Sequence, residues 1–295
     1  MQRLRTELRD LAELAVVPAA GALLPWRTGF VLLKQLARWS WLYRGSCAQA
    51  LEQAQARGVV PPGQEDAWAR QRRLVTLVDH ADHYLARTRS DRFMDRHLQV
   101  MGNWPNPGVA GICLTFHWGA GMWALRHAAA NGLRAHALVA AMEGDPFDGR
   151  AVLRRYAVAR TRSVQNALGR PPLVVTDSLR PVVRALRKGE QVFAAVDVPP
   201  DRVSASVPVQ LQGMPARMPR GLLRLAVDMQ IPVTVYSTGF EPATGQRQLR
   251  IVPLGVHSDV QTLAETVFAE LDALLAEHSA FWHFWSEAPR IFTDR

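Results

Sequence analysis

One stretch, residues 109–132 (VAGICLTFHWGAGMWALRHAAANG), constrains the fold more than any other part of the chain. It begins with an apolar run, 109–116, that stops abruptly at His117. A short apolar run bounded by turn residues indicates a buried strand. A glycine-bearing turn then leads into a segment of helical character, 122–131, which a glycine ends. The stretch therefore predicts a buried strand, a tight turn and a helix.

Strands and helices alternate along the remainder of the chain, which is typical of a layered α/β protein. Apolar runs between turn signals predict strands at 109–116, 135–141, 173–175, 191–196, 207–211, 232–236 and 248–252, the last two joined as a hairpin. Apolar residues at helical spacing predict helices at 2–14, 46–56, 64–101, 122–131, 150–168, 179–186, 219–230 and 260–276. We expect an α/β/α architecture with a mixed, mostly parallel sheet. Residues 1–58 form an N-terminal helical segment in this interpretation, and residues 59–295 form the α/β domain.

Composition excludes several classes of protein. Apolar residues make up 48% of the 295 residues, which is enough for a sizeable core and too little for a polytopic membrane protein. The net charge is +9, yet no nucleic-acid-binding module is recognisable, so we expect no nucleic-acid partner. Glycine-rich nucleotide loops are absent, and Cys47 and Cys113 form no metal motif, so we expect neither metal nor resident cofactor. His80 and His83 match no zinc motif either, and we expect them on a solvated helix face.

Residues 14–43 have the composition of a segment that lies at a membrane surface. Their longest charge-free piece, 14–26, is well short of the ~20 residues that span a bilayer. Basic residues are interleaved with aromatic residues and leucine, as in helices of the membrane interface; these residues are Trp26, Arg27, Phe30, Leu33, Lys34, Arg38, Trp39, Trp41, Tyr43 and Arg44. The alternative is a helical hairpin packed on the domain. Charges precede the first apolar stretch and no cleavage site follows it, so we expect no secretory signal.

Two titratable residues follow apolar strands, at the edge where ligands of open α/β sheets bind. His117 ends the first strand, and Asp197 ends the strand at 191–196. Because carboxyl ends of parallel strands converge on one edge, the two side chains can meet there. A carboxylate that accepts one ring N–H fixes the imidazole tautomer, and the other nitrogen can then take a proton from a hydroxyl. The alternatives are a structural hydrogen bond for His117 and a loop-capping role for Asp197.

Four blocks of the sequence carry a family resemblance. They are LTFHWGAGMWALRHAAANG (114–132), RALRKGEQVFAAVDVPP (184–200), VPVQLQGMPARMPRGLLRLAVDMQIPV (207–233) and HSAFWHFWSEAPRIF (278–292). In this order they resemble the His-x4-acid block, the strand that ends in an acid, the F-F-G-x-P block and the tryptophan-bearing C-terminal segment of the bacterial lipid A late (lauroyl/myristoyl) acyltransferases. That family also includes mycobacterial phosphatidylinositol mannoside acyltransferases and relatives in aryl polyene clusters. The resemblance covers residues 10–292 and implies a glycerolipid acyltransferase-like fold.

The chain departs from this family at one position of the first block. The family's acid stands five residues after the histidine, where this chain has Met122, which cannot accept the imidazole N–H. Asp197 can orient His117 instead, as an acid of that block does in the mannoside acyltransferases. Glu143 or Asp145 can also take that place. The third alternative is a member in which catalysis is weak or lost, and which binds acyl chains or lipids.

The resemblance implies an O-acyl transfer with His117 and Asp197 as the catalytic residues. His117 would deprotonate a hydroxyl of a lipid or glycolipid acceptor, and the oxygen would attack the thioester of acyl carrier protein or coenzyme A. No serine has the surroundings of a nucleophile elbow, which favours direct transfer over a covalent intermediate. Backbone N–H groups near residues 119–121, or an arginine, would stabilise the oxyanion.

The expected substrate-binding residues are Trp118, Gly119, Gly121, Arg160, Arg217 and Arg220. Arg160 falls where the family has an arginine shortly before a glycine, and Arg217 and Arg220 are placed to meet phosphate. Trp118 would line an acyl tunnel or belong to the core. The expected partners are the acyl thioester, the lipid acceptor and a membrane surface. The resemblance places the protein at the cytoplasmic face of the bacterial inner membrane, as a peripheral or monotopic protein.

Overall fold

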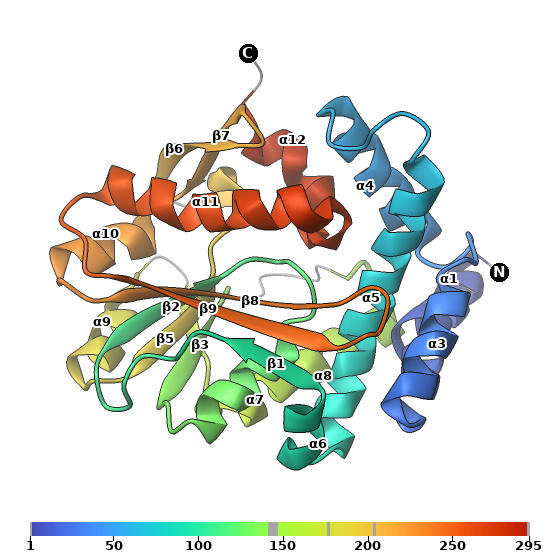
Figure 1. The fold of residues 1–295 in the computed structure, drawn as a ribbon, viewed down its shortest axis with the longest axis horizontal. Helices are drawn as coiled ribbons and strands as arrows, with labels where there is room; N and C mark the ends of the chain where they lie inside the picture. Colours follow the sequence, from blue (N-terminus) through green and yellow to red (C-terminus); the bar gives the residue numbers. More distant parts are fainter. Residues whose placement is uncertain (1, 141–146, 176–177, 203–204, 294–295) are drawn as a thin grey trace.

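The computed structural model describes residues 2–140, 147–175, 178–202 and 205–293 (Figure 1). The helices are α1 (Gln2–Leu11), α2 (Val17–Leu23), α3 (Trp26–Leu36), α4 (Arg44–Ala56), α5 (Glu65–Thr88), α6 (Asp91–Arg96), α7 (Met122–Ala130), α8 (Ala151–Leu168), α9 (Arg180–Arg187), α10 (Gly221–Asp228), α11 (Val260–His278) and α12 (Ala288–Ile291). The strands are β1 (Leu98–Met101), β2 (Gly111–Thr115), β3 (Ala135–Ala140), β4 (Leu173–Val175), β5 (Gln191–Ala195), β6 (Ser206–Leu211), β7 (Met214–Pro219), β8 (Val233–Phe240) and β9 (Arg247–Gly255). A π-helical turn, Ala12–Val16, joins α1 to α2, and short 3₁₀ turns lie at Pro200–Arg202, Ser279–Phe281 and His283–Glu287.

The described strands form a seven-stranded sheet in the order β1-β9-β8-β2-β5-β3-β4, and β6 and β7 form a separate hairpin. β8, β2, β5, β3 and β4 run parallel to one another, and β9 pairs antiparallel with β8 and parallel with β1. The expectation of a mixed, mostly parallel sheet is confirmed. From β2 the chain builds β3 to β5 on one side and then β8 and β9 on the other. The carboxyl end of β2 is therefore a topological switch point, where open α/β sheets bind their ligands.

Helices cover both faces of the sheet, which confirms the α/β class. α10 and α11 lie on one side, and α7, α8 and α9 lie on the other (Figure 1). Phe268 of α11 meets Phe116, the residue after β2, with ring centroids 6.0 Å apart, and most of the apolar run, residues 111–114 and Phe116, is buried. The specific acyltransferase fold stays a prediction.

Two elements differ from the expectation drawn from periodicity. Residues 64–101 do not form one helix, because the Ser90 hydroxyl accepts the N–H of Phe93 and starts α6, after which β1 adds to the sheet beside β9. Residues 214–219 form β7, a strand that the sequence did not predict. Gln212 and Gly213 both have positive φ, 52° and 72°, which is the geometry of a tight hairpin between β6 and β7.

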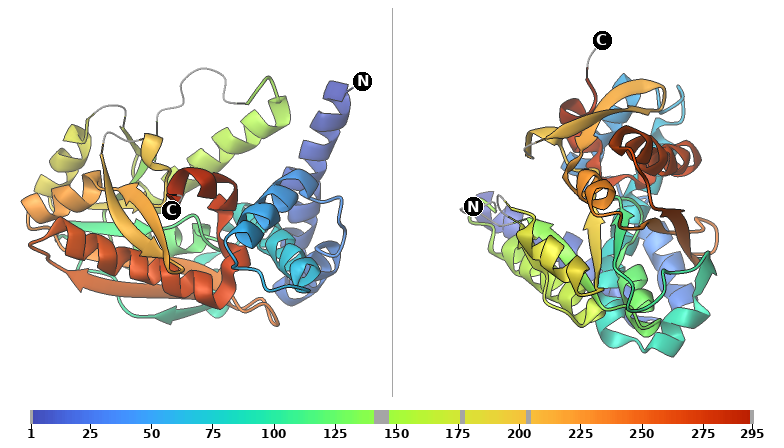
Figure 2. Two further views of the ribbon diagram at one scale, coloured as in Figure 1. Left: turned by 90° about the horizontal axis from the view of Figure 1, so that it is seen from above. Right: turned by 90° about the vertical axis from the view of Figure 1, so that its left-hand side faces the viewer.

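The helices of residues 2–56 pack beside α5 at one end of the sheet (Figure 2). The π-helical turn before α2 follows from Pro18, which has no N–H to donate to the carbonyls of the preceding turn. Tyrosine hydroxyls take up two of these carbonyls: Tyr43 donates to Glu13 O at 2.5 Å, and Tyr84 donates to Leu14 O at 2.7 Å. The division of the chain at residue 58 stays a prediction.

Part of the aromatic set expected at a membrane surface lies in the core instead. Trp26, Phe30, Leu33 and Tyr43 are buried, so these side chains are not available to a membrane. Trp39 and Trp41, in contrast, are about half exposed. Among the described residues, no helix is both long and apolar enough to cross a membrane.

Arg247 forms a buried junction between the helices of residues 2–88 and the sheet. Its guanidinium is fully buried, forms a bidentate ion pair with the equally buried Asp82, and donates to Gly245 O at 2.9 Å. Its Cζ lies 4.0 Å from the ring centroid of Trp26 and 4.8 Å from that of Trp123. Side chains from α3, α5 and α7 therefore meet at the first residue of β9.

Candidate active site

His117 and Asp197 lie side by side at the carboxyl edge of the sheet because of the register of two neighbouring strands. β2 and β5 are parallel, and Thr115 is the partner of Ala195. His117 and Asp197 each stand two residues further on, so the pairing brings them to the same level. His117 Nδ1 lies 2.8 Å from Asp197 Oδ1. The meeting that the sequence predicts from converging strand ends is present in the structure, and its catalytic role stays a prediction.

Asp197 is fully buried and receives three hydrogen bonds. Its Oδ2 accepts the backbone N–H of His117 at 2.8 Å and the indole N–H of Trp282 at 2.8 Å, and its Oδ1 accepts the imidazole. A buried carboxylate is costly unless such donors satisfy it. A carboxylate oxygen at this position accepts from Nδ1–H, so the contact favours the tautomer of His117 whose proton lies on Nδ1.

The second ring nitrogen of His117, Nε2, has no protein partner among the described residues, and 37% of the side chain is exposed. The ring of Phe284 stacks on the imidazole with centroids 3.8 Å apart and an interplanar angle of 12°. The stacking covers one face of the imidazole and restricts its rotation. The result is an oriented, partly exposed imidazole with one nitrogen that bonds no described residue, and a general base needs such a nitrogen.

A second histidine–carboxylate pair shows why the first is different. His136 and Glu190 lie near the opposite edge of the sheet, with His136 Nε2 3.1 Å from Glu190 Oε2. His136 Nδ1 is also engaged, at 2.8 Å from Pro171 O. Both nitrogens of His136 are occupied and the side chain is buried, so this pair has no free nitrogen for a substrate.

The turn after His117 is held against β8. Gly119 has a φ of 69°, and a Cβ at this position would lie 2.2 Å from Thr238 O, so only glycine allows the approach. The N–H of Gly119 donates to Phe281 O at 3.0 Å, and the N–H of Ala120 donates to Thr238 O at 2.8 Å. The expectation that these N–H groups stabilise an oxyanion is therefore wrong for Gly119 and Ala120, because both are already bonded. Gly121 is the N-cap of α7 and offers no side chain to cap the helix. The N–H groups of the first turn of α7 therefore have no side-chain acceptor at the N-cap, and they are the remaining candidates for stabilising an oxyanion.

Arg160 lies in an ion-pair network between α8 and α5. Its guanidinium donates to Asp79 Oδ1 at 2.7 Å and to the hydroxyl of Tyr156 at 3.2 Å. Burial is the largest single influence and raises the pKa of Asp79, but Arg160, His283 and His80 together outweigh it, and the pKa is lowered. The arginine is half-buried and already paired, so it is a fixed group rather than a free anion receptor.

Three histidines around this network are kept neutral by burial. The expectation of a solvated face for His80 and His83 is wrong, because His83 is buried and His80 is half-buried against Tyr156, with Nδ1 2.5 Å from the hydroxyl. Burial lowers the pKa of His80 to about 3 and that of His83 to about 4. It also lowers the pKa of His283, which lies 2.7 Å from Gly119 O through Nε2, to about 4.

These lowered pKa values predict acid sensitivity. Between pH 6.5 and about 4 the unfolded chain binds protons at these histidines and the folded chain does not, so stability falls as the pH falls through this window. His83, nearly fully buried, contributes up to roughly 3 kcal/mol over the whole window. We expect the Tm, measured by differential scanning fluorimetry, to drop between pH 6.5 and 4.5, and to drop less in His83→Asn. An equal drop in His83→Asn and in the unaltered protein would contradict the burial of a neutral His83.

The other expected binding residues are dispersed. Trp118 is buried, with its ring against Gly239 and Phe281, so it belongs to the core. Arg217 is exposed on β7 and donates to the hydroxyl of Ser206. Arg220 is half-buried at the N-cap of α10. No hydrogen bond of the described residues joins either arginine to the dyad of His117 and Asp197.

The sequence offered other positions for the acid that partners His117, and the structure describes only some of them. Met122 is buried in the first turn of α7, and Asp197 occupies the Nδ1 side of the imidazole. Glu143 and Asp145 lie outside the described residues. Among the described residues, no group of three or more His, Cys, Asp or Glu side chains is arranged to hold a metal ion.

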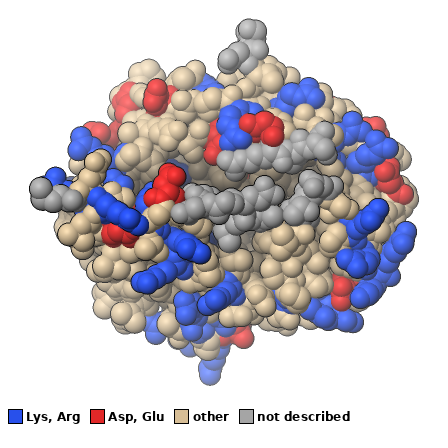
Figure 3. Space-filling model, turned by 180° about the vertical axis from the view of Figure 1, so that it is seen from behind, with Lys and Arg blue, Asp and Glu red and all other residues tan. Residues whose placement is uncertain are grey.

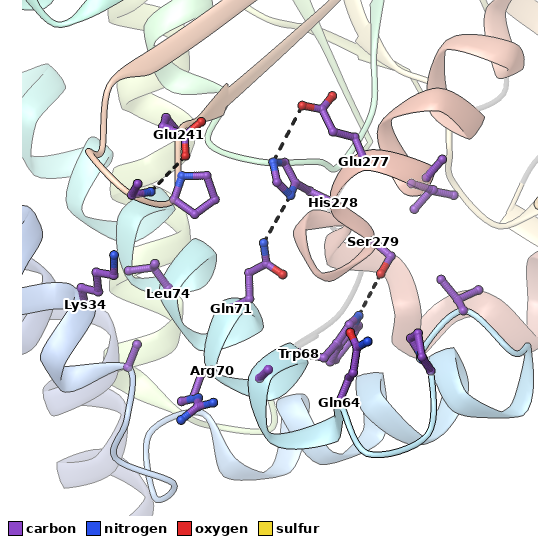
Figure 4. Close-up of a pocket in the computed structure, with 18 of the residues that line it drawn as sticks. Lys34, Gln64, Trp68, Arg70, Gln71, Leu74, Glu241, Glu277, His278 and Ser279 are labelled. Carbon is purple, nitrogen blue, oxygen red and sulfur yellow. Dashed lines mark hydrogen bonds and ion pairs between the residues drawn. The ribbon is translucent and has the colours of Figure 1, made fainter.

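A groove of about 1030 Å³ lies away from the dyad, between α3, α5, the β8–β9 turn and the end of α11 (Figure 4). Its lining includes Lys34, Arg70 and Glu241, together with Trp68, whose indole N–H donates to the hydroxyl of Ser279. Neither His117 nor Asp197 lines it. The groove is therefore separate from the chemistry of the dyad.

Sequence reasoning missed the side chains that complete the dyad. Trp282, His283 and Phe284 all contact the turn or the dyad. The sequence signal for them is the aromatic C-terminal segment, which the family resemblance includes without indicating what its side chains contact. Its role depends on contacts with residues more than 80 positions away.

Comparison with known proteins adds no family assignment. No family model matches the chain, and no curated protein matches it. The function must therefore be inferred from the geometry of the dyad together with the motifs of the sequence.

Proposed function

We propose that the protein is an O-acyltransferase that moves an acyl chain from a thioester of acyl carrier protein or coenzyme A to a hydroxyl of a lipid or glycolipid. The observation that carries the proposal is the pairing of His117 with the buried Asp197 through Nδ1, in an imidazole whose Nε2 has no hydrogen-bond partner among the described residues and whose side chain is 37% exposed. Four sequence blocks in family order support it.

In the proposed reaction His117 acts as the general base. Nε2 takes the proton of the acceptor hydroxyl while its oxygen forms a bond with the thioester carbonyl carbon. The C–S bond of the tetrahedral intermediate then breaks, and Nε2 returns the proton to the departing thiolate. Asp197 stays ionised and stabilises the imidazolium through Nδ1. The N–H groups in the first turn of α7, an uncapped helix N-terminus, would stabilise the oxyanion.

The test is acyl transfer by the purified protein. Acyl thioesters of acyl carrier protein and of coenzyme A are incubated with bacterial lipid extract, free thiol is measured, and the lipids are analysed by mass spectrometry. We expect thiol release together with a lipid whose mass has increased by that of one fatty acid less water. Thioester that remains intact with every lipid fraction would contradict transfer and favour the alternative, an acyl- or lipid-binding protein without catalysis.

The proposal includes a membrane surface, and α1 supplies its strongest support. Its acidic side chains face the protein: Glu7 accepts the N–H groups of Ala151 and Val152, and buried Asp10 pairs with Arg150. Its apolar side faces out instead, because Leu4, Leu8 and Leu11 are 64%, 57% and 42% exposed. An apolar helix face turned to solvent is typical of a membrane or partner contact.

The charge of the molecule favours an anionic membrane. The net charge is +9, and basic side chains are spread over the face seen in Figure 3, mainly over its lower half. α1 projects at one end of the molecule (Figure 2). Insertion of its leucines would hold the protein at a lipid surface as a peripheral protein, at the cytoplasmic face of the inner membrane in the setting that the resemblance implies.

Leu8→Glu is expected to weaken binding to anionic liposomes about tenfold or more, because burial of one leucine contributes roughly 1.5–3 kcal/mol. Sedimentation with phosphatidylglycerol vesicles measures the bound fraction. Val256→Glu is the matched control, since Val256 is also exposed but follows β9 rather than lying on α1. Equal binding of the two variants, or no binding of the unaltered protein, would contradict the role of α1.

A further inference from the structure

The segment 280–285 wraps around the turn that carries His117. The N–H of His283 donates to His117 O at 2.6 Å, and Phe281 O accepts the N–H of Gly119 at 3.0 Å. The ring of His283 adds a third bond, with Nε2 2.7 Å from Gly119 O. Both sides of the turn are thus tied to a part of the chain that follows α11.

Trp282 connects this segment to the carboxylate. Its indole N–H donates to Asp197 Oδ2 at 2.8 Å, and both side chains are fully buried. Without this donor, Oδ2 would keep, of its partners among the described residues, only the backbone N–H of His117. Bulk water cannot replace the indole because neither group is exposed, so the orientation of the carboxylate depends on Trp282.

Trp282 is itself held in place by rigid neighbours. Its ring packs edge-on against Trp285, with centroids 4.9 Å apart and an interplanar angle of 80°. Arg72 of α5, nearly fully buried, donates to the carbonyls of Ala280, Trp282 and His283 at 3.3, 2.8 and 3.2 Å. The indole is therefore fixed before any substrate binds.

We propose that Trp282 is a positioning residue of the transfer reaction, which acts on His117 through Asp197. The indole fixes the plane of the carboxylate so that Oδ1 accepts the Nδ1–H of His117. This contact keeps the proton on Nδ1 and leaves Nε2 free as the base. The ring of Phe284, stacked on one face of the same imidazole, also restricts the rotation of the imidazole. The inference rests on the proposed function only where it refers to transfer; the geometry that it assigns is independent of the substrate.

The chain offers a matched pair of variants. Trp285 lies in the same segment, is equally buried and donates one indole hydrogen bond, at 2.7 Å to the backbone oxygen of Ser279 rather than to Asp197. Trp282→Phe and Trp285→Phe remove similar volumes and one hydrogen bond each. A merely structural role for Trp282 would give the two variants the same behaviour.

The first readout is kinetic. Loss of a hydrogen bond to a charged group predicts that Trp282→Phe lowers kcat about 10- to 100-fold with little change in KM. Trp285→Phe is expected to keep kcat near that of the unaltered protein. Equal kcat values in the two variants would overturn the proposal.

The second readout does not require activity, and so separates this inference from the proposed function. Proton NMR follows exchange of the His117 Nδ1–H with water. We expect at least about tenfold faster exchange in Trp282→Phe than in Trp285→Phe, since the lost bond leaves the carboxylate free to rotate. Equal exchange rates would overturn the positioning role even in a protein that transfers no acyl group. Should Trp282→Phe fail to fold, replacement of Trp282 by 3-benzothienylalanine, which keeps the ring shape and lacks the N–H, gives the same comparison.

Discussion

His117→Ala is expected to lower kcat for acyl transfer by about 10²- to 10⁴-fold and to leave KM nearly unchanged, because it removes the only proposed acceptor of the hydroxyl proton. Asp197→Asn is expected to lower kcat by a factor in the same range. An amide at this position can donate to Nδ1, which favours the tautomer whose proton lies on Nε2. Initial rates of thiol release, measured with one thioester and one acceptor, give both values.

His136→Ala is the control for these two variants. His136 also contacts a carboxylate, that of Glu190, but both of its nitrogens are occupied inside the protein. We expect this variant to lose stability and to keep its kcat. Equal kcat values for His117→Ala and the unaltered protein would contradict the general-base role. Equal losses in His117→Ala and His136→Ala would assign the effect to folding.

Arg247→Met is expected to lower the free energy of unfolding by about 3–5 kcal/mol, the largest stability effect expected of any single substitution proposed for this chain. The change leaves the carboxylate of Asp82 buried without its cation. It also removes the guanidinium from between the rings of Trp26 and Trp123, so helices α3, α5 and α7 lose a common contact. Urea denaturation, followed by tryptophan fluorescence, measures the loss.

Arg250→Met is the matched control on the same strand. Arg250 pairs with Glu270 at 3.1 Å, but 45% of its side chain is exposed. An ion pair of this kind contributes about 0–1 kcal/mol, so the control should unfold at nearly the same urea concentration as the unaltered protein. Similar losses in Arg247→Met and Arg250→Met would show that the buried junction is not what joins the helices to the sheet.

The strand–turn–helix unit around His117 could be predicted because its signals are local. An apolar run, a glycine turn and a helical period all lie within residues 109–132. The pairing with Asp197 could also be predicted, since both residues end apolar strands and parallel strands share a carboxyl edge.

Other elements depend on contacts that no local pattern encodes. β1 is an edge strand whose residues continue a helical period, and its pairing with β9 decides its conformation. The apolar residues on the outward face of α1 have the same sequence spacing as apolar residues on a helix face that is buried. The carboxylates of Glu7 and Asp10, which bond to Ala151 at the start of α8 and to Arg150 just before it, show which side points inward.

The side chains that complete the site also come from distant parts of the sequence. Trp282 is 85 residues from Asp197 in sequence, and an indole N–H in an aromatic segment carries no signal of its partner. The oxyanion expectation failed at Gly119 for a similar reason. Its N–H is bonded to Phe281 O, from a part of the chain that the turn itself does not specify.

The tautomer of His117 tests the central claim most directly. Nitrogen-15 NMR of the labelled imidazole, at a pH where the ring is neutral, reports which nitrogen carries the proton. The pairing with Asp197 predicts a proton on Nδ1 and a bare Nε2. A proton on Nε2 would contradict the claim, because the imidazole would then have no lone pair to offer an acceptor hydroxyl.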